Sequence, residues 1–573
     1  RIIYNNINAI LSILWYGGSV RKLYNTMLKD YFEVPNKPAV KSGNILSCDF
    51  TDHETFIPQP LDYSRGTIAT YVDCNGLIKM SGVSDTELVT NGDFATDSDW
   101  TLTRASIANG YLILSTSDGS NTGATQTLGT IGKTYQISLE VVNITGTISV
   151  VLGGGTDVDI STSGTHTVYI TAVSTALEIK RKFGVTNVSA TIDNVSVREV
   201  DIETPRIDYL TEIGKAKELQ KPSLLLEPES TNTATDSNNF TVGDIFNASN
   251  NPSSNQSVIT ANKTTAPDGS NNGWELRDDG EGGVGVCRLV YFGTVVSSGN
   301  INTFSVFLKK GSIDYGQLRT DGFEVTANGT TIFDLVNGTI VSSDPDHIDP
   351  KIQDYGNGWY RCTISNTATT DTVGSFSVAL SRASGGSVPR DGTNFIYMFG
   401  VQAETLGYCT SYIPTSGGIR TRNQDLANNA GQLGVFNNEE GVLYCEIQAL
   451  AADSTNKYIA ISNGTTSNRV NIFFDANNVL RGFTIGISSI PSSAIITDSN
   501  KVAFKYESGE LALFLNGAKV GTRTSSISLS GLDTFSFDNG GAGSKFYGRI
   551  KEVKAFRRAL TDSELQELTN NIV

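Results

Sequence analysis

The chain's strongest constraint is a two-residue alternation of apolar and polar side chains, which recurs in short runs from about residue 83 onward. In the run TYQISLEVV, Tyr135, Ile137, Leu139 and Val141 would all face one side of a strand. This period is that of a strand with one face in a core. Many such runs, separated by clusters of Gly, Asn, Asp and Ser, are typical of antiparallel sandwiches. We predict a mainly β chain of tandem jelly-roll-type β-sandwiches.

Local signals support this fold class. Residues 303–308 alternate in the same way, and Asn516-Gly517 lies between two strand patterns. Asn-Gly is the strongest short hairpin signal, because both central residues of that turn need positive φ. Near the end of the chain, Thr561 and Glu564 have the spacing of a capping box and predict a short helix.

The N-terminal segment has a different pattern. Residues 2–16 are rich in Ile and Leu, and residues 20–32 place apolar side chains at helical spacing among basic ones. One or two amphipathic helices fit this pattern better than strands. We assign residues 1–80 to docking or oligomerisation, the alternative being a helical pair that only covers the next domain. The chain opens on Arg1, so we expect a processed or incomplete N-terminus.

Composition excludes several function classes. The net charge is −16 and there are no basic runs, so a nucleic-acid ligand is not expected. Three histidines offer little material for His-based catalysis or zinc sites. The six cysteines lack metal-type spacing, and we interpret them as free thiols. No apolar run approaches about 20 residues, so no membrane span is predicted.

Residues 83–200 resemble a known sandwich. They open with N-G-D-F at 91–94 and close with I-D-N-V at 192–195. This pair of strands resembles the first and last strands of a carbohydrate-binding-module jelly roll. The resemblance implies a glycan-binding β-sandwich.

Residues 231–420 carry four further motifs: A-P-D-G at 266–269, G-N-G-W-Y-R-C at 356–362, V-Q-A-E at 401–404 and T-S-Y-I-P-T at 410–415. Together they resemble a sandwich that is common in bacteriophage tail and fibre proteins. The resemblance implies a phage-tail-type β-sandwich.

Residues 431–573 end with G-R-I-K-E-V at 548–553 and R-A-L-T-D-S-E at 558–564. This ending resembles that of laminin-G or concanavalin-A-like domains. The resemblance implies a third β-sandwich.

A fourth resemblance joins distant segments. Residues 61–73 and 76–78 resemble a phage structural motif that normally continues almost directly into P-R-x-D-Y and L-L-L-E-P. Here the continuation appears only at 205–209 and 224–228. We therefore predict that the sandwich at 83–200 is inserted into a surface loop, where extra length costs little entropy. The docking unit would then continue at residues 201–230.

Four aromatic residues are candidate glycan-binding platforms: Trp100, Tyr111, Trp274 and Tyr360. The C–H faces of sugars pack on aromatic rings. The alternative is that these rings fill the sandwich cores, which needs no ligand.

Asp93 and Asp193 lie on the predicted first and last strands of the sandwich at 83–200. The jelly-roll resemblance implies a structural Ca²⁺ between them, held by carboxylate and backbone oxygens. The alternative is that both carboxylates cap turns.

The resemblances together imply a non-enzymatic bacteriophage virion protein, a tail fibre or projecting appendage that is extracellular. Its N-terminal region would bind other virion proteins, and its sandwiches would bind host-surface polysaccharide weakly and in several copies. A homo-oligomer is expected, with the trimer as the usual fibre symmetry. Two alternatives remain: an architectural or decoration protein of the virion without glycan binding, and a secreted bacterial glycan-binding or glycan-degrading protein.

Overall fold

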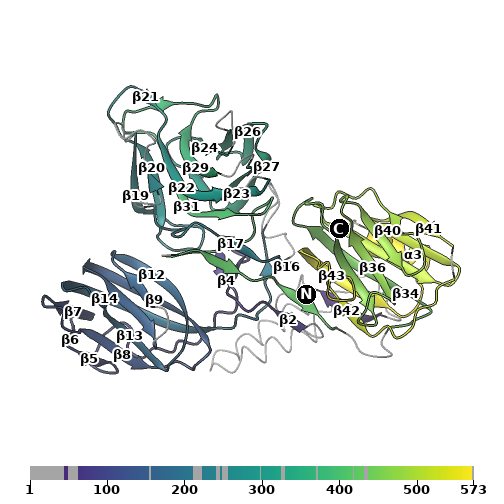
Figure 1. Ribbon diagram of the computed structural model, residues 1–573, viewed down its shortest axis with the longest axis horizontal. Helices are drawn as coiled ribbons and strands as arrows, with labels where there is room; N and C mark the ends of the chain where they lie inside the picture. Colours follow the sequence, from purple (N-terminus) through teal and green to yellow (C-terminus); the bar gives the residue numbers. More distant parts are fainter. Residues whose placement is uncertain are drawn as a thin grey trace, which may run out of the picture. The chain divides into compact units, whose positions relative to one another are not determined.

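The computed structural model describes residues 44–49 and 62–570, apart from 154–156, 211–221, 241–245, 248–255, 297–298, 324–328, 369–371, 417, 431–435 and 525. The chain divides after residue 44, and the described residues lie almost wholly in the longer unit, residues 45–573. The helices predicted at 2–16 and 20–32 lie outside the described residues. Of the longer unit, Figure 1 shows a fold built almost entirely of strands, which confirms the prediction of a mainly β chain of antiparallel sandwiches.

Residues 83–200 form two five-stranded antiparallel sheets, drawn in blue in Figure 1. The first has the order β11-β10-β13-β8-β5, with β5 (Thr101–Thr103), β8 (Gly123–Thr127), β10 (Ile148–Leu152), β11 (Val158–Ile160) and β13 (Ala176–Arg181). The second has the order β12-β9-β14-β7-β6, with β6 (Ala105–Ala108), β7 (Tyr111–Thr116), β9 (Thr134–Thr145), β12 (Gly164–Thr171) and β14 (Val188–Val200). A hydrophobic core fills the space between them.

The next sandwich pairs two six-stranded sheets. One has the order β18-β22-β29-β24-β25-β26, with β18 (Phe246–Asn247), β22 (Arg288–Val296), β24 (Tyr315–Asp321), β25 (Thr330–Asp334), β26 (Thr339–Ser343) and β29 (Thr372–Ser381). The other has the order β19-β20-β31-β23-β28-β27, with β19 (Ser257–Thr264), β20 (Gly273–Asp278), β23 (Ile301–Lys310), β27 (Ile348–Gly356), β28 (Trp359–Thr367) and β31 (Phe395–Glu404). A short ribbon accompanies them, β21 (Val284–Gly285) with β30 (Val388–Pro389).

The C-terminal sandwich packs an eight-stranded sheet on a five-stranded one. The larger has the order β15-β16-β43-β34-β39-β40-β41, with β15 (Ile207–Asp208), β16 (Ser223–Leu226), β34 (Glu440–Ala449), β39 (Asn500–Glu507), β40 (Glu510–Leu515), β41 (Ala518–Arg523) and β43 (Gly548–Phe556), which also pairs with β1 (Asn44–Asp49). The smaller has the order β38-β37-β36-β35-β42, with β35 (Lys457–Ser462), β36 (Arg469–Phe474), β37 (Leu480–Thr484), β38 (Ile490–Pro491) and β42 (Thr534–Ser536). The described helix is α3 (Asp562–Thr569).

Three parts of the chain that are far apart in sequence pair with one another: residues 62–81, the described residues of 201–232 (201–210 and 222–232), and those of 405–430 (405–416 and 418–430). We call them the joint. Their small ribbons are β2 (Asp62–Ser64) with β33 (Leu426–Asn428), β3 (Thr70–Val72) with β4 (Ile78–Met80), and β17 (Ser230–Asn232) with β32 (Arg420–Arg422).

The two ends of the segment 83–200 meet beside the joint. Val83 and Val200 form an antiparallel bridge, and the N–H of Asp201 donates to the carbonyl of Gly82. Gly82 has a φ of +74°, and a Cβ there would lie 2.0 Å from the carbonyl oxygen of Asp201. Only glycine fits this position, because it combines positive φ with close backbone approach.

Several local predictions are confirmed. Tyr135 and its three alternating partners are buried on β9. Asn516 and Gly517 have positive φ between the paired β40 and β41. Thr561 and Glu564 form the capping box of α3.

The alternation at 303–308 does not leave one face open, as a simple sandwich strand would. Phe304, Val306 and Leu308 of β23 point into the core of the sandwich. Ser305 and Phe307 point to the other side of the sheet, and they are just as buried. Tyr412 of the joint packs edge-on against Phe307, with ring centroids 5.7 Å apart, and Arg361 donates to the hydroxyl of Ser305 at 2.9 Å. The joint therefore covers this sheet. No helix among the described residues is long and apolar enough to cross a membrane.

Candidate functional site

Arg206 is the centre of a buried ion-pair network in the joint. Its guanidinium donates from Nη1 to Oε2 of Glu227 at 2.7 Å and from Nη2 to Asp425. The same Nη1 donates to the hydroxyl of Ser411 at 2.7 Å and the carbonyl of Thr70 at 3.1 Å. Residues from all three joint segments thus meet on one side chain that has no exposed surface.

Two further arginines complete the network. Arg65 donates to Oδ1 of Asp425 at 3.3 Å, and Arg422 lies 3.5 Å from Oε2 of Glu227 and 3.8 Å from Oδ2 of Asp425. Arg65 also donates to the carbonyl of Ile202 at 2.8 Å, next to the return of the chain at Asp201. The network therefore holds three arginines against two carboxylates.

The backbone places the two carboxylates side by side. The N–H of Asp425 donates to the carbonyl of Glu227 at 2.9 Å, and the N–H of Glu227 donates to Oδ2 of Asp425 at 2.8 Å. Ser411 donates to Glu227 from its N–H at 2.7 Å and its hydroxyl at 2.6 Å. The oxygens of both carboxylates are thus hydrogen-bonded, as buried charges require.

Burial and pairing oppose each other in setting these charges. Burial raises the pKa of the Glu227 carboxyl, but Arg422 and Arg206 outweigh it and hold that pKa below its usual range. Burial lowers the pKa of Arg206, but Asp425 and Glu227 raise it overall. Glu227 is therefore ionised at neutral pH, and it is a structural anion rather than a proton donor.

A second ion pair links the joint to the C-terminal sandwich. Asp208 pairs with Arg549 of β43, and its other oxygen accepts the N–H of Val72 at 2.7 Å. β15 carries Asp208 into the eight-stranded sheet, because β15 pairs with β16 and β16 pairs with β43.

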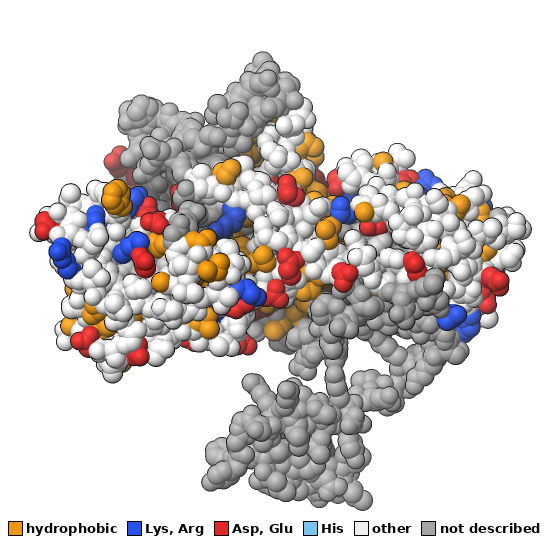
Figure 2. Space-filling view, turned by 60° about the horizontal axis from the view of Figure 1, so that its bottom comes forward, with side chains coloured by type: hydrophobic (Ala, Val, Ile, Leu, Met, Phe, Trp, Pro, Cys, Tyr) orange, Lys and Arg blue, Asp and Glu red, His pale blue; other side chains and the backbone are white. Residues whose placement is uncertain are grey.

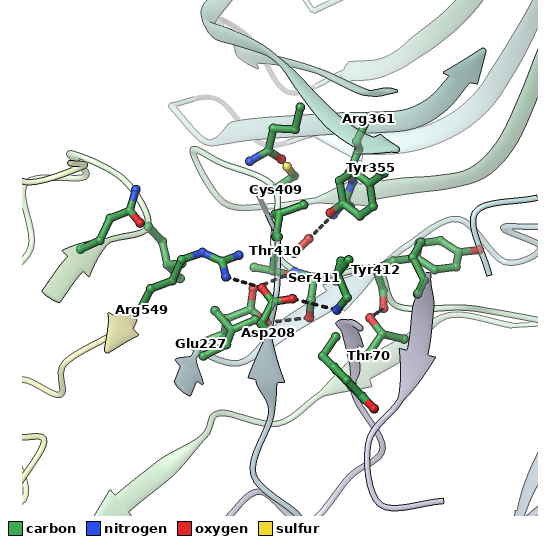
Figure 3. A pocket seen from close by; sticks show the side chains of 18 of the residues that line it. Thr70, Asp208, Glu227, Tyr355, Arg361, Cys409, Thr410, Ser411, Tyr412 and Arg549 are labelled. Atoms are coloured by element: carbon green, nitrogen blue, oxygen red, sulfur yellow. Dashed lines mark hydrogen bonds and ion pairs between the residues drawn. The ribbon is translucent and has the colours of Figure 1, made fainter. Parts of the chain in front are cut away.

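A cavity of about 110 Å³ lies beside these groups, lined by the joint and by residues of β27, β28, β34 and β43. Figure 3 shows Arg549 directed toward Asp208, and Ser411 beside Glu227. Small-molecule pockets usually measure roughly 300–1,000 Å³. This polar space suits a few water molecules better than a sugar.

A second candidate site lies on the C-terminal sandwich, on the face of its five-stranded sheet (β38-β37-β36-β35-β42) that points away from the core. We call this the outward face of the five-stranded sheet. Tyr458 of β35 and Phe473 of β36 are opposite each other and stack with ring centroids 4.4 Å apart at 5°. Phe483 of β37 follows on the same face, opposite Asn471. Side chains of the other parity point into the core, so these rings lie on the opposite face, where Tyr458 and Phe483 are partly exposed and Phe473 is buried.

Arg469 lies across these rings. Its guanidinium carbon is 5.6 Å from the ring centroid of Tyr458 and 5.5 Å from that of Phe483. Its Nη1 donates to the carbonyl of Asn539 at 2.6 Å. The face thus combines aromatic surface with a guanidinium, which a sugar-binding surface can use.

The aromatic residues predicted as platforms are placed as follows. Trp100 is 8% exposed in its core, and its indole N–H donates to the carbonyl of Asn91 at 3.1 Å. Trp274 is 9% exposed in its core, and its N–H donates to the carbonyl of Asn238 at 3.0 Å. Tyr111 on β7 is partly buried.

Tyr360 on β28 is also partly buried, and it packs against the core of its sandwich. Its hydroxyl donates to the carbonyl of Val336 at 3.4 Å. The structure brings these four residues into no common surface: Trp100 and Tyr111 belong to one sandwich, and Trp274 and Tyr360 to another. Their glycan-stacking role stays a prediction.

The two predicted calcium ligands make local contacts. Asp93 is exposed and accepts the N–H of Ala95 at 3.3 Å, and Asp193 accepts the N–H of Asn194 at 2.7 Å. Among the described residues, no group of three or more His, Cys, Asp or Glu side chains could hold a metal ion. The Ca²⁺ site stays a prediction.

Several residues of these sites could not be picked out from the sequence. Arg206 and Glu227 fall within the motifs at 205–209 and 224–228, but their partners Arg422 and Asp425 lie outside every motif. In the strand RVNIFF, parity places Arg469 on the same face as the aromatic ring of Phe473, but nothing in the sequence shows that Arg469 lacks a counter-charge. Hydrophobicity alone assigns such a ring to the core.

Surface charge is dispersed. On the face shown in Figure 2, acidic and basic side chains lie singly among uncharged ones. No continuous basic area covers the described residues on that face.

Comparison with known families gives one match. Residues 446–566 match the family model described as the concanavalin A-like lectin/glucanases superfamily. This confirms the concanavalin-A-like resemblance of the C-terminal sandwich. The matched residues include all five strands of the sheet that carries the outward face. No curated protein sequence matches the chain.

Solved structures give only distant likenesses. The CBM40 of the Ruminococcus gnavus IT-sialidase, bound to α2,3-sialyllactose, is 18% identical over 25% of this chain and 94% of its own, with a TM-score of 0.21. Domains LG4-5 of the mouse laminin α1 chain are 9% identical over 48% and 88%, with a TM-score of 0.17. Trypanosoma rangeli sialidase is 10% identical over 88% and 98%, with a TM-score of 0.21. Likenesses at TM-scores this low do not establish a shared fold or function.

Proposed function

We propose that this chain is a non-enzymatic glycan-binding protein that projects from a bacteriophage particle as a tail fibre or appendage. The observation that carries the glycan-binding part is the outward face of the five-stranded sheet. There Tyr458, Phe483 and Arg469 form an aromatic and cationic surface within residues that match a lectin and glucanase superfamily.

The particle role is supported by the joint. The residues that resemble phage structural motifs, among them Arg65, Arg206, Asp208 and Glu227, lie in one buried ionic assembly. A joint of this kind fixes projecting sandwiches to a common base. We propose that residues 83–200 are an insertion in this base, because their two ends bridge at Val83 and Val200.

The absence of catalysis is part of the proposal. Glycan cleavage commonly needs two carboxyl groups, one of which stays protonated as general acid. Glu227 is instead ionised and bound by arginine. The outward face that carries the aromatic rings presents Arg481 with Asp475, which are paired with each other at 2.6 Å.

The test has two arms. The full chain is applied to a glycan array, where we expect weak binding that strengthens when the chain is displayed in several copies. Purified particles are analysed by quantitative mass spectrometry, where we expect the chain in fixed stoichiometry. Presence in particles without glycan binding would support a purely architectural role, and absence from particles would point to a secreted bacterial protein.

A further inference from the structure

We propose that the outward face of the five-stranded sheet binds glycans that carry a carboxylate, with Arg469 as the group that recognises it. This inference rests on the proposed glycan-binding function and adds the class of sugar. It starts from a charge that has no counter-charge within the described part of the chain.

Arg469 makes no ion pair with any carboxylate in the described residues. Nη1 donates a hydrogen bond to the carbonyl of Asn539, and Nε is buried without a partner. Nη2 has no partner there either, and it is not among the buried atoms. Arginine presents its donors in a rigid fork that matches a carboxylate, so the free side of this guanidinium suits that group.

Asn471 is the second observation that points to a ligand. Its side chain has no exposed surface, yet neither its amide oxygen nor its amide nitrogen has a hydrogen-bond partner. Asn471 lies between Ala460 and Phe483 in the ladder, two residues from Arg469 on the same face. Buried polar groups almost always have partners, so an unpaired amide on the same face as a guanidinium without a counter-charge marks a place where polar contacts are still to be made.

The neighbouring rings supply the rest of a sugar site. Tyr458 and Phe483 are partly exposed and flank the guanidinium. A pyranose ring can pack its C–H face on such a ring while its carboxylate reaches Nη2 of Arg469. The aromatic rings hold the guanidinium in place, which lowers the entropy cost of binding.

Arg481 gives a matched control on the same face. It carries the same charge, but it pairs with Asp475 at 2.6 Å and donates to the hydroxyl of Ser489 at 3.2 Å. Replacing Arg481 removes one positive charge near the rings without removing an unpaired guanidinium. Any loss of binding from charge alone would appear in both variants.

The experiment titrates the full chain with three polyuronates (polygalacturonate, alginate and hyaluronan) and with each polymer after its carboxylates are reduced to alcohols. Hyaluronan carries its carboxylate on every second sugar only, and the other two polymers carry one on every sugar. We expect the native chain to bind at least one of these uronate-containing polymers about tenfold or more tightly than its reduced form. Arg469→Gln should remove this preference, Arg469→Lys should restore part of it, and Arg481→Gln should change the affinity less than twofold.

A second measurement needs no variant. Phenylglyoxal modifies accessible arginines, and bound polyuronate should protect Arg469 several-fold while leaving Arg481 unprotected, as read by mass spectrometry. Equal affinity for native and reduced polymers, equal losses in the Arg469 and Arg481 variants, or no polyuronate binding would overturn this inference. Array binding to neutral glycans alone would do so while leaving the proposed function standing, and no binding to any glycan would contradict both.

Discussion

The joint and the outward face of the five-stranded sheet use arginine in opposite ways. In the joint, Arg206 is wholly buried and held by Glu227 and Asp425. On the outward face, Arg469 lies on aromatic rings and has no carboxylate among the described residues. A buried guanidinium with carboxylate partners holds segments together, whereas a partly exposed one without a counter-charge has donors left for a ligand.

The largest loss of stability is expected from breaking the ion pairs in the joint. Glu227→Gln leaves three buried arginines with one carboxylate, and breaking a buried ion pair typically costs about 3–5 kcal/mol. We expect a lower transition temperature in calorimetry. We also expect faster amide exchange at residues 224–227 and 410–412. The local exchange readout is needed because a chain of several domains has no single unfolding free energy.

Glu178→Gln is the matched control for that change. Glu178 pairs with Lys180 at 2.5 Å on the surface, with side chains 35% and 39% exposed. Exposed pairs contribute about 0–1 kcal/mol. Similar destabilisation by the two substitutions would show that the joint is not a special ionic assembly.

The second largest effect is expected from acid, which should destabilise the joint. The pKa of Glu227 is lower in the folded chain than in the unfolded one, because Arg422 and Arg206 outweigh the effect of burial. Its stabilisation is therefore complete well above the unfolded value of about 4.3 and is lost as the pH falls through the folded pKa. We expect the amide protection factors of residues 224–227, which are corrected for the intrinsic pH dependence of exchange, to fall between pH 5 and pH 3 more steeply in the native chain than in Glu227→Gln. Parallel pH profiles in the two chains would contradict this.

A smaller effect, on glycan binding, is expected at the outward face of the five-stranded sheet. Tyr458→Ala removes a ring that supports Arg469 and offers a stacking surface, and aromatic contacts of this kind contribute about 0.5–1.5 kcal/mol. We expect glycan binding to weaken about three- to tenfold, with no change in amide exchange at the joint. Tyr111→Ala, which removes a partly buried tyrosine from another sandwich, is the comparison. A greater loss of binding in that variant would move the site to the predicted platform at Tyr111.

The smallest effect lies outside both regions and sets the scale. Thr561 caps α3 together with Glu564, whose pKa is lowered to about 2, first by Arg558 and then by the N–H of Thr561. Thr561→Ala should cost about 1 kcal/mol of local stability, measured by amide exchange of residues 562–569, and leave glycan binding unchanged. A change in binding would show that the outward face responds to small losses of stability.

Much of the fold was predictable from local patterns, and the joint was not. Strand alternation at Tyr135, the turn at Asn516-Gly517 and the cap at Thr561 each depend on residues close in sequence. Arg206 and Asp425 are 219 residues apart, and no local period records their pairing. The double burial of β23 was missed for the same reason, because Tyr412, which covers it, belongs to a distant segment.

For the candidate site, the sequence indicated only the kind of residue, an aromatic ring, and not which rings lie at the surface. Trp100 and Trp274 were chosen for their size, but large rings satisfy a core as readily as a ligand, and both indoles are at most 9% exposed. Tyr458 and Phe483 could be found from strand parity once the register was known. Arg469 could not, because the absence of a counter-charge is a property of the folded surface.

The most direct test is an experimental structure of the full chain soaked with an acidic oligosaccharide taken from a polyuronate that it binds. We expect sugar density on the outward face, with the carboxylate within hydrogen-bond distance of Arg469 and a sugar ring against Tyr458 or Phe483. We also expect the contacts among Arg206, Glu227 and Asp425 to be unchanged. Sugar density elsewhere on the chain, or a carboxylate directed away from Arg469, would contradict it.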